Sequence, residues 1–457
     1  MRATTLKEIA AWCGGTVARE YENVEITGLC HDSREAENGT LFFALEGQTD
    51  GHRFVPAAKS QGAAAAVCSK EIGMDFPVVL VEDTRKALRD VATAYKATMD
   101  CKTVAITGSV GKTTTRTMIS HLLMQQYKTS CTIKNYNNDI GLPVTIGAST
   151  PDCQMLVLEM GMNHFGEMSV LTAIGRPDLV VITNIGSMHI ENLGSREGIL
   201  KAKLEILEGL KPGGIAVFNG DEPLLWGLRD RTNCETVYFG LENEACAFRA
   251  VDVELHESSS TFRIQGQGYD FPVEIPVSGV HNVHNATAAI VVALLLEVPV
   301  EKIQKAMLSY ENTSQRQQTI HHKGFTIIDD TYNAGPESME AALRVLGDTS
   351  GQGEKFKRIA VLGDMLELGN HASAEHHRIG RVAANKANLL LTYGPLSEKT
   401  VRGAITGGMS QRNAMNFGTK EELLNVLRNR AKPGDVLLFK GSHGMHMEDV
   451  LKAFMEA

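Results

Sequence analysis

The chain has 457 residues, of which 43% are hydrophobic and 22% are charged. At roughly 150 residues per domain this length predicts about three domains, and the composition excludes a disordered or fibrous chain. The net charge of −9 argues against a general nucleic-acid or anionic-membrane surface, although it leaves room for a local basic pocket that binds a small anion.

The eight cysteines are scattered singly, without a CxxC pair. A disulfide framework or a structural zinc site is therefore not expected, and the pattern favours a reducing, cytoplasmic location. The longest apolar stretch, residues 288–296, is far too short for a membrane span and predicts a buried helix. The first residues lead into the polar, helix-like segment TTLKEIAAW, which does not resemble a secretion signal. We expect a monomer with no nucleic-acid or membrane partner.

Residues 1–83 predict a small α/β module. A short helix precedes four strands, VEITGLC, TLFFAL, AAAVCS and PVVLVED, and the segments DSR and TDGHRF lie between them. The helix TRKALRDVATAYKA begins at Thr84 and leads into the next domain.

Residues 84–314 and 315–457 predict two further α/β domains. The first contains the apolar runs KTVAIT, QMLVLEM, DLVVITN and GIAVFN, then the strand-rich segments CAFRAVDVELHE, STFRIQGQ and YDFPVEIPV. The second contains FTIIDD, RIAVLGD, NLLLTYG and DVLLFKG. Continuous apolar runs that alternate with helices are typical of parallel strands buried on both faces. The fold class predicted is α/β, with three domains.

A phosphate-binding loop is the strongest motif. It follows the strand 102–107, opens a helix that we expect to end near residue 126, and comprises Gly108, Ser109, Val110, Gly111, Lys112, Thr113 and Thr114. Backbone N–H groups and the positive end of the helix favour a phosphate there, Lys112 can reach its oxygens, and Thr113 can bind Mg²⁺. The spacing is shorter than GxxxxGK[ST], because Ile106 occupies the position of the first glycine. No GxGxxG segment supports dinucleotide binding.

Two polar residues end the neighbouring predicted strands. Glu159 closes the strand MLVLE, and His189 follows the strand LVVITN after a short turn. Since parallel strands end at the same edge of a sheet, both side chains could face a triphosphate and its Mg²⁺. For Glu159 alone a solvated loop position is an equally good interpretation, and for His189 alone an ordinary loop position is the better one, but the context favours a site role for both.

Nine segments then resemble one family. In chain order they are GSVGKTTT, NYNNDIGLPVT, LEMGMNHFGEM, TNIGSMHIENLG, KAKLEI, GVHNVHNATAA, DDTYNAGPESM, GDMLELG and LFKGSHGM. Together they resemble the Mur ligases of peptidoglycan precursor synthesis over nearly the whole chain. The DSR and DGHRF segments are similar to the uridine-nucleotide domain of the tripeptide- and D-alanyl-D-alanine-adding enzymes, and GDMLELG resembles the latter specifically. The DNPR-like motif of the diaminopimelate- and lysine-adding branch is missing from the comparable segment LTYGP.

The resemblance implies an ATP-dependent amide ligase that works through an acyl phosphate. Its substrates would be UDP-N-acetylmuramoyl-tripeptide and D-alanyl-D-alanine. The first domain would bind the nucleotide sugar, the central domain ATP, and the C-terminal Rossmann-like domain would complete the ligase site. The cofactors implied are ATP, two Mg²⁺ ions and a CO₂-derived carbamate on Lys203.

The resemblance also assigns residues. The catalytic set is Lys112, Glu159, His189 and Lys203, and the metal ligands are Thr113, Glu159, His189 and the carbamate of Lys203. Besides the loop, Asn282, Asn285, Arg316 and Asp330 are implied to bind ATP. Ser33, Arg34, Asn137, Asn138 and Asp139 are implied to bind substrate. The chain departs from the family at Gly335-Pro336, where an Asn-Pro pair is frequent, which puts a substrate role for residue 335 in doubt.

Two alternatives and some histidines stay open. A folylpolyglutamate synthase or a diaminopimelate-adding ligase is one alternative, and the first domain argues against the folate enzyme. A P-loop module that only binds ATP is the other, and the combined set of catalytic residues argues against it. His281 and His284 have metal-like spacing, yet their place at a helix start favours an adenine site. The histidine pairs 321–322 and 376–377 are expected on the surface.

Overall fold

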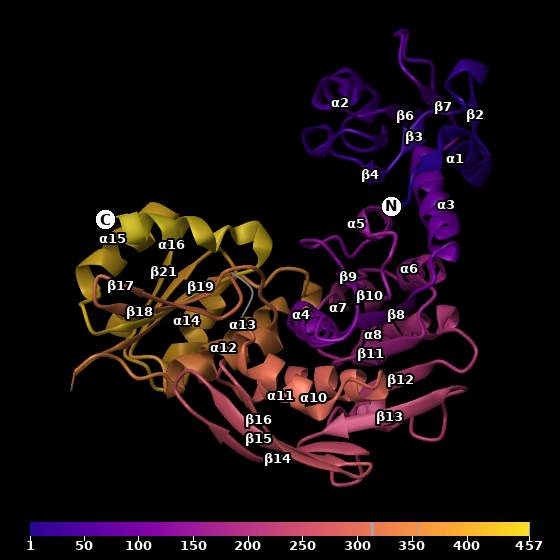
Figure 1. Cartoon of the computed structure of the whole chain (residues 1–457). Coiled ribbons are helices and arrows are strands. Elements are labelled where there is room, and N and C mark those ends of the chain that lie inside the picture. The colour runs from indigo at the N-terminus through magenta and orange to yellow at the C-terminus, as the bar shows by residue number, and fades with distance from the viewer. Residues whose placement is uncertain (312–314, 354, 457) are drawn as a thin grey trace.

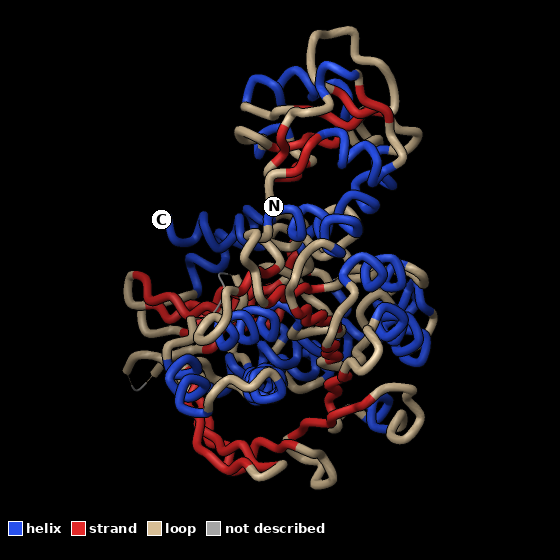
Figure 2. The backbone as a smooth tube through the Cα atoms, turned by 45° about the vertical axis from the view of Figure 1, so that its right-hand side comes forward, coloured by secondary structure: helices blue, strands red, loops and turns tan. Residues whose placement is uncertain are grey.

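The computed structural model describes residues 1–311, 315–353 and 355–456, and three sheets divide it into three α/β parts (Figure 1). The N-terminal part projects from the central part in both views and contacts it, for example through the ion pair of Glu35 with Lys134 at 2.6 Å, whereas the central and C-terminal parts lie against each other (Figures 1 and 2). This arrangement confirms the predicted α/β class with three domains.

The N-terminal sheet has the order β2-β7-β6-β5-β4, in which β4 to β7 run parallel and β2 is antiparallel. Its strands and the separate pair β1 and β3 are β1 (Thr4–Thr5), β2 (Thr16–Val17), β3 (Glu25–Ile26), β4 (Gly28–Cys30), β5 (Thr40–Phe43), β6 (Ala65–Cys68) and β7 (Val78–Leu80). Its helices are α1 (Leu6–Cys13) and α2 (Val55–Gln61). The segment VEITGLC is not one strand, because the chain pairs first with β1 and then, after Thr27, with β5.

The central sheet has the order β16-β15-β14-β13-β12-β11-β8-β10-β9. Its strands are β8 (Lys102–Thr107), β9 (Thr129–Cys131), β10 (Met155–Glu159), β11 (Leu179–Ile182), β12 (Ile215–Asn219), β13 (Glu235–Gly240), β14 (Phe248–Leu255), β15 (Ser260–Gly266) and β16 (Tyr269–Ile275). Pairing is parallel from β9 through β14 and antiparallel for β15 and β16. The helices are α3 (Thr84–Ala97), α4 (Lys112–Leu123), α5 (Gly141–Ala148), α6 (Glu167–Gly175), α7 (Ile190–Leu193), α8 (Arg196–Leu204), α9 (Pro223–Trp226), α10 (Val280–Leu295) and α11 (Val300–Leu308).

The C-terminal sheet has the order β17-β18-β22-β19-β20-β21 and is parallel except for β17. Its strands are β17 (Gln318–His322), β18 (Phe325–Asp330), β19 (Arg358–Gly363), β20 (Leu389–Tyr393), β21 (Ala414–Phe417) and β22 (Val436–Lys440). Its helices are α12 (Pro336–Asp348), α13 (Ala372–Lys386), α14 (Ser397–Thr406), α15 (Lys420–Arg430) and α16 (Met447–Glu456).

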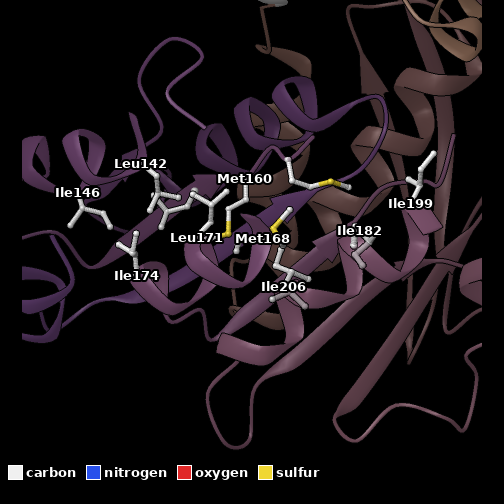
Figure 3. Close-up of a cluster of buried hydrophobic side chains, with 14 of the residues drawn as sticks. Leu142, Ile146, Met160, Met168, Leu171, Ile174, Ile182, Ile199 and Ile206 are labelled. Atoms are coloured by element: carbon white, nitrogen blue, oxygen red, sulfur yellow. The ribbon is translucent and has the colours of Figure 1, made fainter. Parts of the chain in front are cut away.

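Helices cover both faces of the central sheet, which explains its continuous apolar strands. Val104 and Ile106 of β8 belong to the core shared with α4 and α10, whereas Ala105 belongs to the opposite core. That opposite core holds side chains of α5, α6 and α8, such as Ile146, and is drawn in Figure 3. Packing on both faces fixes the carboxyl ends of β8, β10 and β11 side by side at one edge, where the predicted site residues stand.

Candidate active site

The phosphate loop lies between β8 and α4. Gly111 has a φ of +84° and directly precedes the helix, which begins at Lys112. A Cβ at Gly111 would come within 2.4 Å of the Asn285 Oδ1, and one at Gly108 within 1.9 Å of the Thr183 Oγ1. Both positions therefore require glycine, since the backbone is close to α10 on one side and to the end of β11 on the other.

The segment after β11 holds this loop in place through hydrogen bonds. The Asn184 Oδ1 accepts hydrogen bonds from the backbone N–H groups of Ser109 (3.1 Å) and Val110 (2.9 Å). The Ser109 Oγ in turn accepts one from the Gly186 N–H at 2.8 Å. The loop is thus held in its conformation before any phosphate binds, so less ordering entropy is lost on binding.

Lys112 is half-buried and folds back over the loop. Its Nζ donates to the carbonyl oxygens of Gly108 at 2.8 Å and Ser109 at 3.2 Å. Burial lowers the pKa of Lys112, whereas the nearby charge of Glu159 raises it and that of Arg316 lowers it. An incoming phosphate would exchange two neutral carbonyl partners for a charge-assisted contact.

Thr113 and Glu159 form the oxygen-rich centre of the site. The Thr113 Oγ1 donates to one Glu159 carboxylate oxygen at 2.9 Å, and the Asn137 Nδ2 donates to the other at 2.9 Å. Glu159 is 2% exposed, and the Arg116 Nε lies 3.9 Å from it. A hydroxyl and a carboxylate are hard oxygen donors, and this pair fits Mg²⁺ bound together with phosphate oxygens. Among the described residues no three His, Cys, Asp or Glu side chains lie close enough to hold a metal ion.

His189 joins the central domain to the C-terminal domain. Its backbone φ is +64°, and its Nδ1 lies 2.6 Å from the Glu367 Oε2, although the contact is not an aligned hydrogen bond. Two residues earlier, Ser187 donates to the Glu337 Oε1 through its N–H and its Oγ, both at 2.8 Å. The other oxygen of Glu337 is buried and has no hydrogen-bond partner among the residues that the structure describes. Glu337 and Glu367 of the C-terminal domain therefore both contact the segment that follows β11.

Lys203 lies on α8 and is 2% exposed. Within the described part of the chain its ammonium group has no hydrogen-bond or ion-pair partner, and it does not line the cleft. Burial and the nearby charge of Lys112 lower its pKa well below the ordinary value. An unpaired buried cation beside a second lysine is energetically costly, so burial at this position favours the neutral amine.

The other residues predicted to bind ATP lie where the central and C-terminal domains meet. Asn282 and Asn285 lie near the start of α10, and the Asn282 Nδ2 donates to the Ser278 carbonyl at 2.8 Å. Arg316 stacks on the Tyr332 ring at 4.0 Å. The Asp330 Oδ2 accepts a hydrogen bond from the Lys440 Nζ at 2.6 Å, and Lys440 is almost fully buried.

One cleft of about 870 Å³ connects these groups. Its walls include the phosphate loop, the start of α10, the loop 137–139 and the C-terminal segment around Asp330 and Lys440. A volume of this size suits a nucleotide together with part of a second substrate.

The predicted substrate residues divide into two groups. Asn137, Asn138 and Asp139 line the cleft, but the Asn138 Oδ1 accepts a hydrogen bond from the Gly141 N–H at the start of α5, and Asp139 forms a bidentate ion pair with Arg85. Ser33 and Arg34 lie in the N-terminal domain, outside this cleft. Arg34 is exposed and forms a close ion pair with Asp32, which lowers the Asp32 pKa to about 2.

The histidine expectations are partly wrong. His376 is buried, not on the surface, because its ring accepts a hydrogen bond from the Met365 N–H at 3.0 Å and contacts the Ala372 carbonyl at 2.7 Å. His376 thereby holds the backbone of the GDMLELG segment in place through the hydrogen bond from Met365. His281 and His284 both line the cleft, and burial lowers the pKa of each.

Several cleft residues were missed from the sequence. They are Arg85, Arg89, Glu337 and Lys440, and Glu367, which contacts the cleft residue His189, was missed as well. Lys440 ends a parallel strand, the same signal that singled out Glu159, and could have been found. The arginines lie on an amphipathic helix whose sequence does not distinguish them from surface charges.

Comparison with known proteins gives three matching family models. Residues 25–97 match the Mur ligase family catalytic domain, residues 106–293 the Mur ligase middle domain, and residues 315–443 the Mur ligase glutamate ligase domain. The UDP-N-acetylmuramoyl-tripeptide--D-alanyl-D-alanine ligase of Bacillus subtilis is 38% identical over 460 residues, which covers 99% of this chain and 98% of that protein. The chain belongs to the Mur ligase family.

Two solved structures extend this result to the fold of this Mur ligase. The Acinetobacter baumannii UDP-N-acetylmuramoylalanyl-D-glutamyl-2,6-diaminopimelate--D-alanyl-D-alanyl ligase is 31% identical, with a TM-score of 0.86 and coverage of 100% and 99% of the two chains. The MurF ligase of Thermotoga maritima in complex with ADP is 29% identical, with a TM-score of 0.81 and coverage of 94% and 97%. In the described parts of this Mur ligase no helix is long and apolar enough to cross a membrane.

Proposed function

We propose that this Mur ligase joins D-alanyl-D-alanine to UDP-N-acetylmuramoyl-tripeptide at the expense of ATP. The terminal carboxylate of the tripeptide attacks the γ-phosphorus of ATP, which gives an acyl phosphate and ADP. The amine of D-alanyl-D-alanine then attacks the acyl carbon, loses a proton, and phosphate leaves. The scattered cysteines favour a cytoplasmic location for this reaction.

One observation carries the proposal. The phosphate loop, the Thr113–Glu159 pair and the Asp330–Lys440 pair all open into one cleft between two domains. Groups from both domains are needed for a ligase, whereas a module that only binds ATP has no use for the second set. The full-length similarity to named D-alanyl-D-alanine-adding ligases supports the choice of substrates.

The chain's own residues have distinct tasks in this scheme. Lys112 and the loop N–H groups balance the charge on the transferring phosphoryl group, and the preformed loop keeps them in place. Asp330 is suited to accept hydrogen bonds from the ribose, since Lys440 occupies only one of its oxygens. Arg316, stacked on Tyr332, brings a cation from the C-terminal domain to the phosphates.

Thr113, Glu159 and His189 would hold Mg²⁺, which when bound offsets phosphate charge. Lys203 is proposed to carry a carbamate, in which the neutral Nζ forms a bond to the carbon of CO₂ and releases one proton. Its lowered pKa increases the share of the neutral amine, the form that reacts with CO₂. The carbamate would place an anion beside Lys112, whose positive charge would stabilise it.

A phosphate- and ADP-release assay with purified substrates tests the function. The wild type should release ADP only when ATP, the nucleotide tripeptide and D-alanyl-D-alanine are all present. Release with a nucleotide dipeptide and diaminopimelate instead would assign the chain to the other branch. Absence of release under every combination would contradict an enzymatic role.

Lys112→Ala supplies the matched mutational test. Its rate should fall by on the order of 10³-fold or more, as expected when a group that stabilises transition-state charge is removed. Lys102→Ala, at the exposed opposite end of β8, is the control and should keep wild-type activity. Near-normal turnover in a folded Lys112→Ala protein would refute the assignment.

A further inference from the structure

Arg89 is a cleft cation with unused hydrogen-bonding capacity. It lies on α3, lines the cleft, and its side chain is 30% exposed. Its guanidinium makes no hydrogen bond within the described residues, and its ion-pair contact is a long one of 3.8 Å from Nη1 to the Asp139 Oδ2. A guanidinium carries five N–H donors, so nearly all of this capacity is available to a ligand.

The acidic groups nearby are already engaged elsewhere. Asp139 accepts two short hydrogen bonds from Arg85, 2.7 Å from Nε and 2.6 Å from Nη2. Asp83 caps α3 by accepting from the N–H groups of Arg85 and Lys86. Asp90 pairs with the Lys86 Nζ.

Glu167 is a further acidic residue that lines the cleft. Its carboxylate accepts hydrogen bonds from the N–H groups of Asn163 at 2.7 Å and His164 at 3.3 Å. Arg85 and Asp139 therefore neutralise each other, Glu167 is bound by backbone groups, and the charge of Arg89 is left for an anion that enters the cleft.

The position of Arg89 limits which anion this is. Asn137 contacts Glu159 directly, and Asp139 is two residues further along the same loop. Arg85, Arg89, Asp139 and Glu159 line the same cleft, so the arginine cluster opens into the space that holds the reacting groups. The nucleotide end of the substrate is expected in the N-terminal domain, outside this cleft. Arg89 therefore faces the peptide part of the substrate and not its diphosphate.

We propose that Arg89 binds a carboxylate of the tripeptide other than the one that reacts. This inference rests on the proposed function. The substrate named for the A. baumannii relative contains a D-glutamyl residue and a diaminopimelate residue. Each can offer a free carboxylate, the α-carboxylate of the first or the distal carboxylate of the second. A planar guanidinium suits either group, because two parallel N–H donors match the two carboxylate oxygens.

The test compares wild type with Arg89→Ala on three nucleotide tripeptides. One ends in diaminopimelate, the second ends in lysine and lacks the distal carboxylate, and the third has D-isoglutamine in place of D-glutamate. With the first substrate, Arg89→Ala should raise KM by about 10- to 100-fold, as expected for a lost charge-assisted hydrogen bond. KM for ATP should stay unchanged, and kcat should change far less than KM.

The three substrates identify which carboxylate is bound. If Arg89 binds the distal carboxylate, the mutational penalty disappears with the lysine substrate. If it binds the D-glutamyl carboxylate, the penalty disappears with the isoglutamine substrate. An equal penalty with all three substrates, or no penalty with the first, would overturn the inference.

Two control variants separate the loss of the paired donors from a general change in α3. Arg89→Lys keeps the charge but not the paired donors, so it should recover part of the affinity. Lys86→Ala, which removes an exposed ion pair with Asp90 on the same helix, should leave every KM unchanged. If the wild type itself turns over none of the tripeptides, the proposed function fails, whereas an active wild type with an unaffected Arg89→Ala refutes Arg89 binding alone.

Discussion

The substitution Lys440→Met would remove the ammonium group that pairs with the carboxylate of Asp330. Lys440 is 2% exposed, and its Nζ donates to the Asp330 Oδ2 at 2.6 Å and to the Asn333 carbonyl at 2.8 Å. Removing one member of a buried ion pair leaves a buried charge without a partner, which costs about 3–5 kcal/mol. The double variant Lys440→Met/Asp330→Asn removes both charges and should cost less than Lys440→Met alone. The two sites should therefore show a coupling energy of about 2–3 kcal/mol.

Hydrogen exchange measured by mass spectrometry on peptides from β18 and β22 gives the local free energy of opening for each variant. Lys420→Met is the matched control, because its pair with Asp449 is partly exposed and should contribute less than about 1 kcal/mol. The reasoning is refuted if the cost of the double variant equals the sum of the single costs. It is equally refuted if Lys440→Met costs no more than the control.

Three further predictions concern the other domains. Arg34→Ala should raise KM for the nucleotide substrate by about tenfold, the loss expected for one ionic hydrogen bond, and leave KM for ATP unchanged in steady-state assays. Lys203→Ala should be nearly inactive and regain some turnover with added acetate, whereas full activity without acetate would contradict the carbamate. The Glu35 carboxylate accepts hydrogen bonds from the Lys134 ammonium and the Tyr136 hydroxyl, and both lower its pKa. This contact is therefore stable above the usual glutamate pKa of about 4.3. It weakens as the pH falls through the lowered value. Protection of residues 133–136 from hydrogen exchange should follow that loss of stability, and a Glu35→Gln variant should show no such pH dependence.

Local sequence patterns predicted most of the fold. The strand KTVAIT is found at the same residues as β8, and the helix that begins at Thr84 is capped by Asp83. Such elements are predictable because their signals, an apolar run or a capping residue, lie within a few neighbouring residues. The helix after the phosphate loop ends at Leu123, three residues before the expected end, and helix ends carry weaker signals than helix bodies.

Prediction from the sequence failed where burial or pairing depends on segments that are distant in the chain. His376 belongs to an amphipathic helix with charged neighbours, so nothing local indicates that it supports the backbone of Met365. VEITGLC carries a strand pattern throughout, yet two different partner strands divide it at Thr27. In both cases the partner is supplied by a segment that the local pattern does not contain.

The sequence by itself determined the three α/β domains, the phosphate loop and the strand-end carboxylate Glu159, because each is written in a short and continuous pattern. Tertiary structure alone decided which side chains meet. It placed Lys440 on Asp330, Glu367 beside His189 and Asp139 between two arginines of α3. These pairs join residues from 50 to more than 170 positions apart, so their contacts depend on how the strands are ordered in each sheet and how the domains dock. A hydrogen bond requires partners within about 3 Å, and only the folded chain sets distances on that scale.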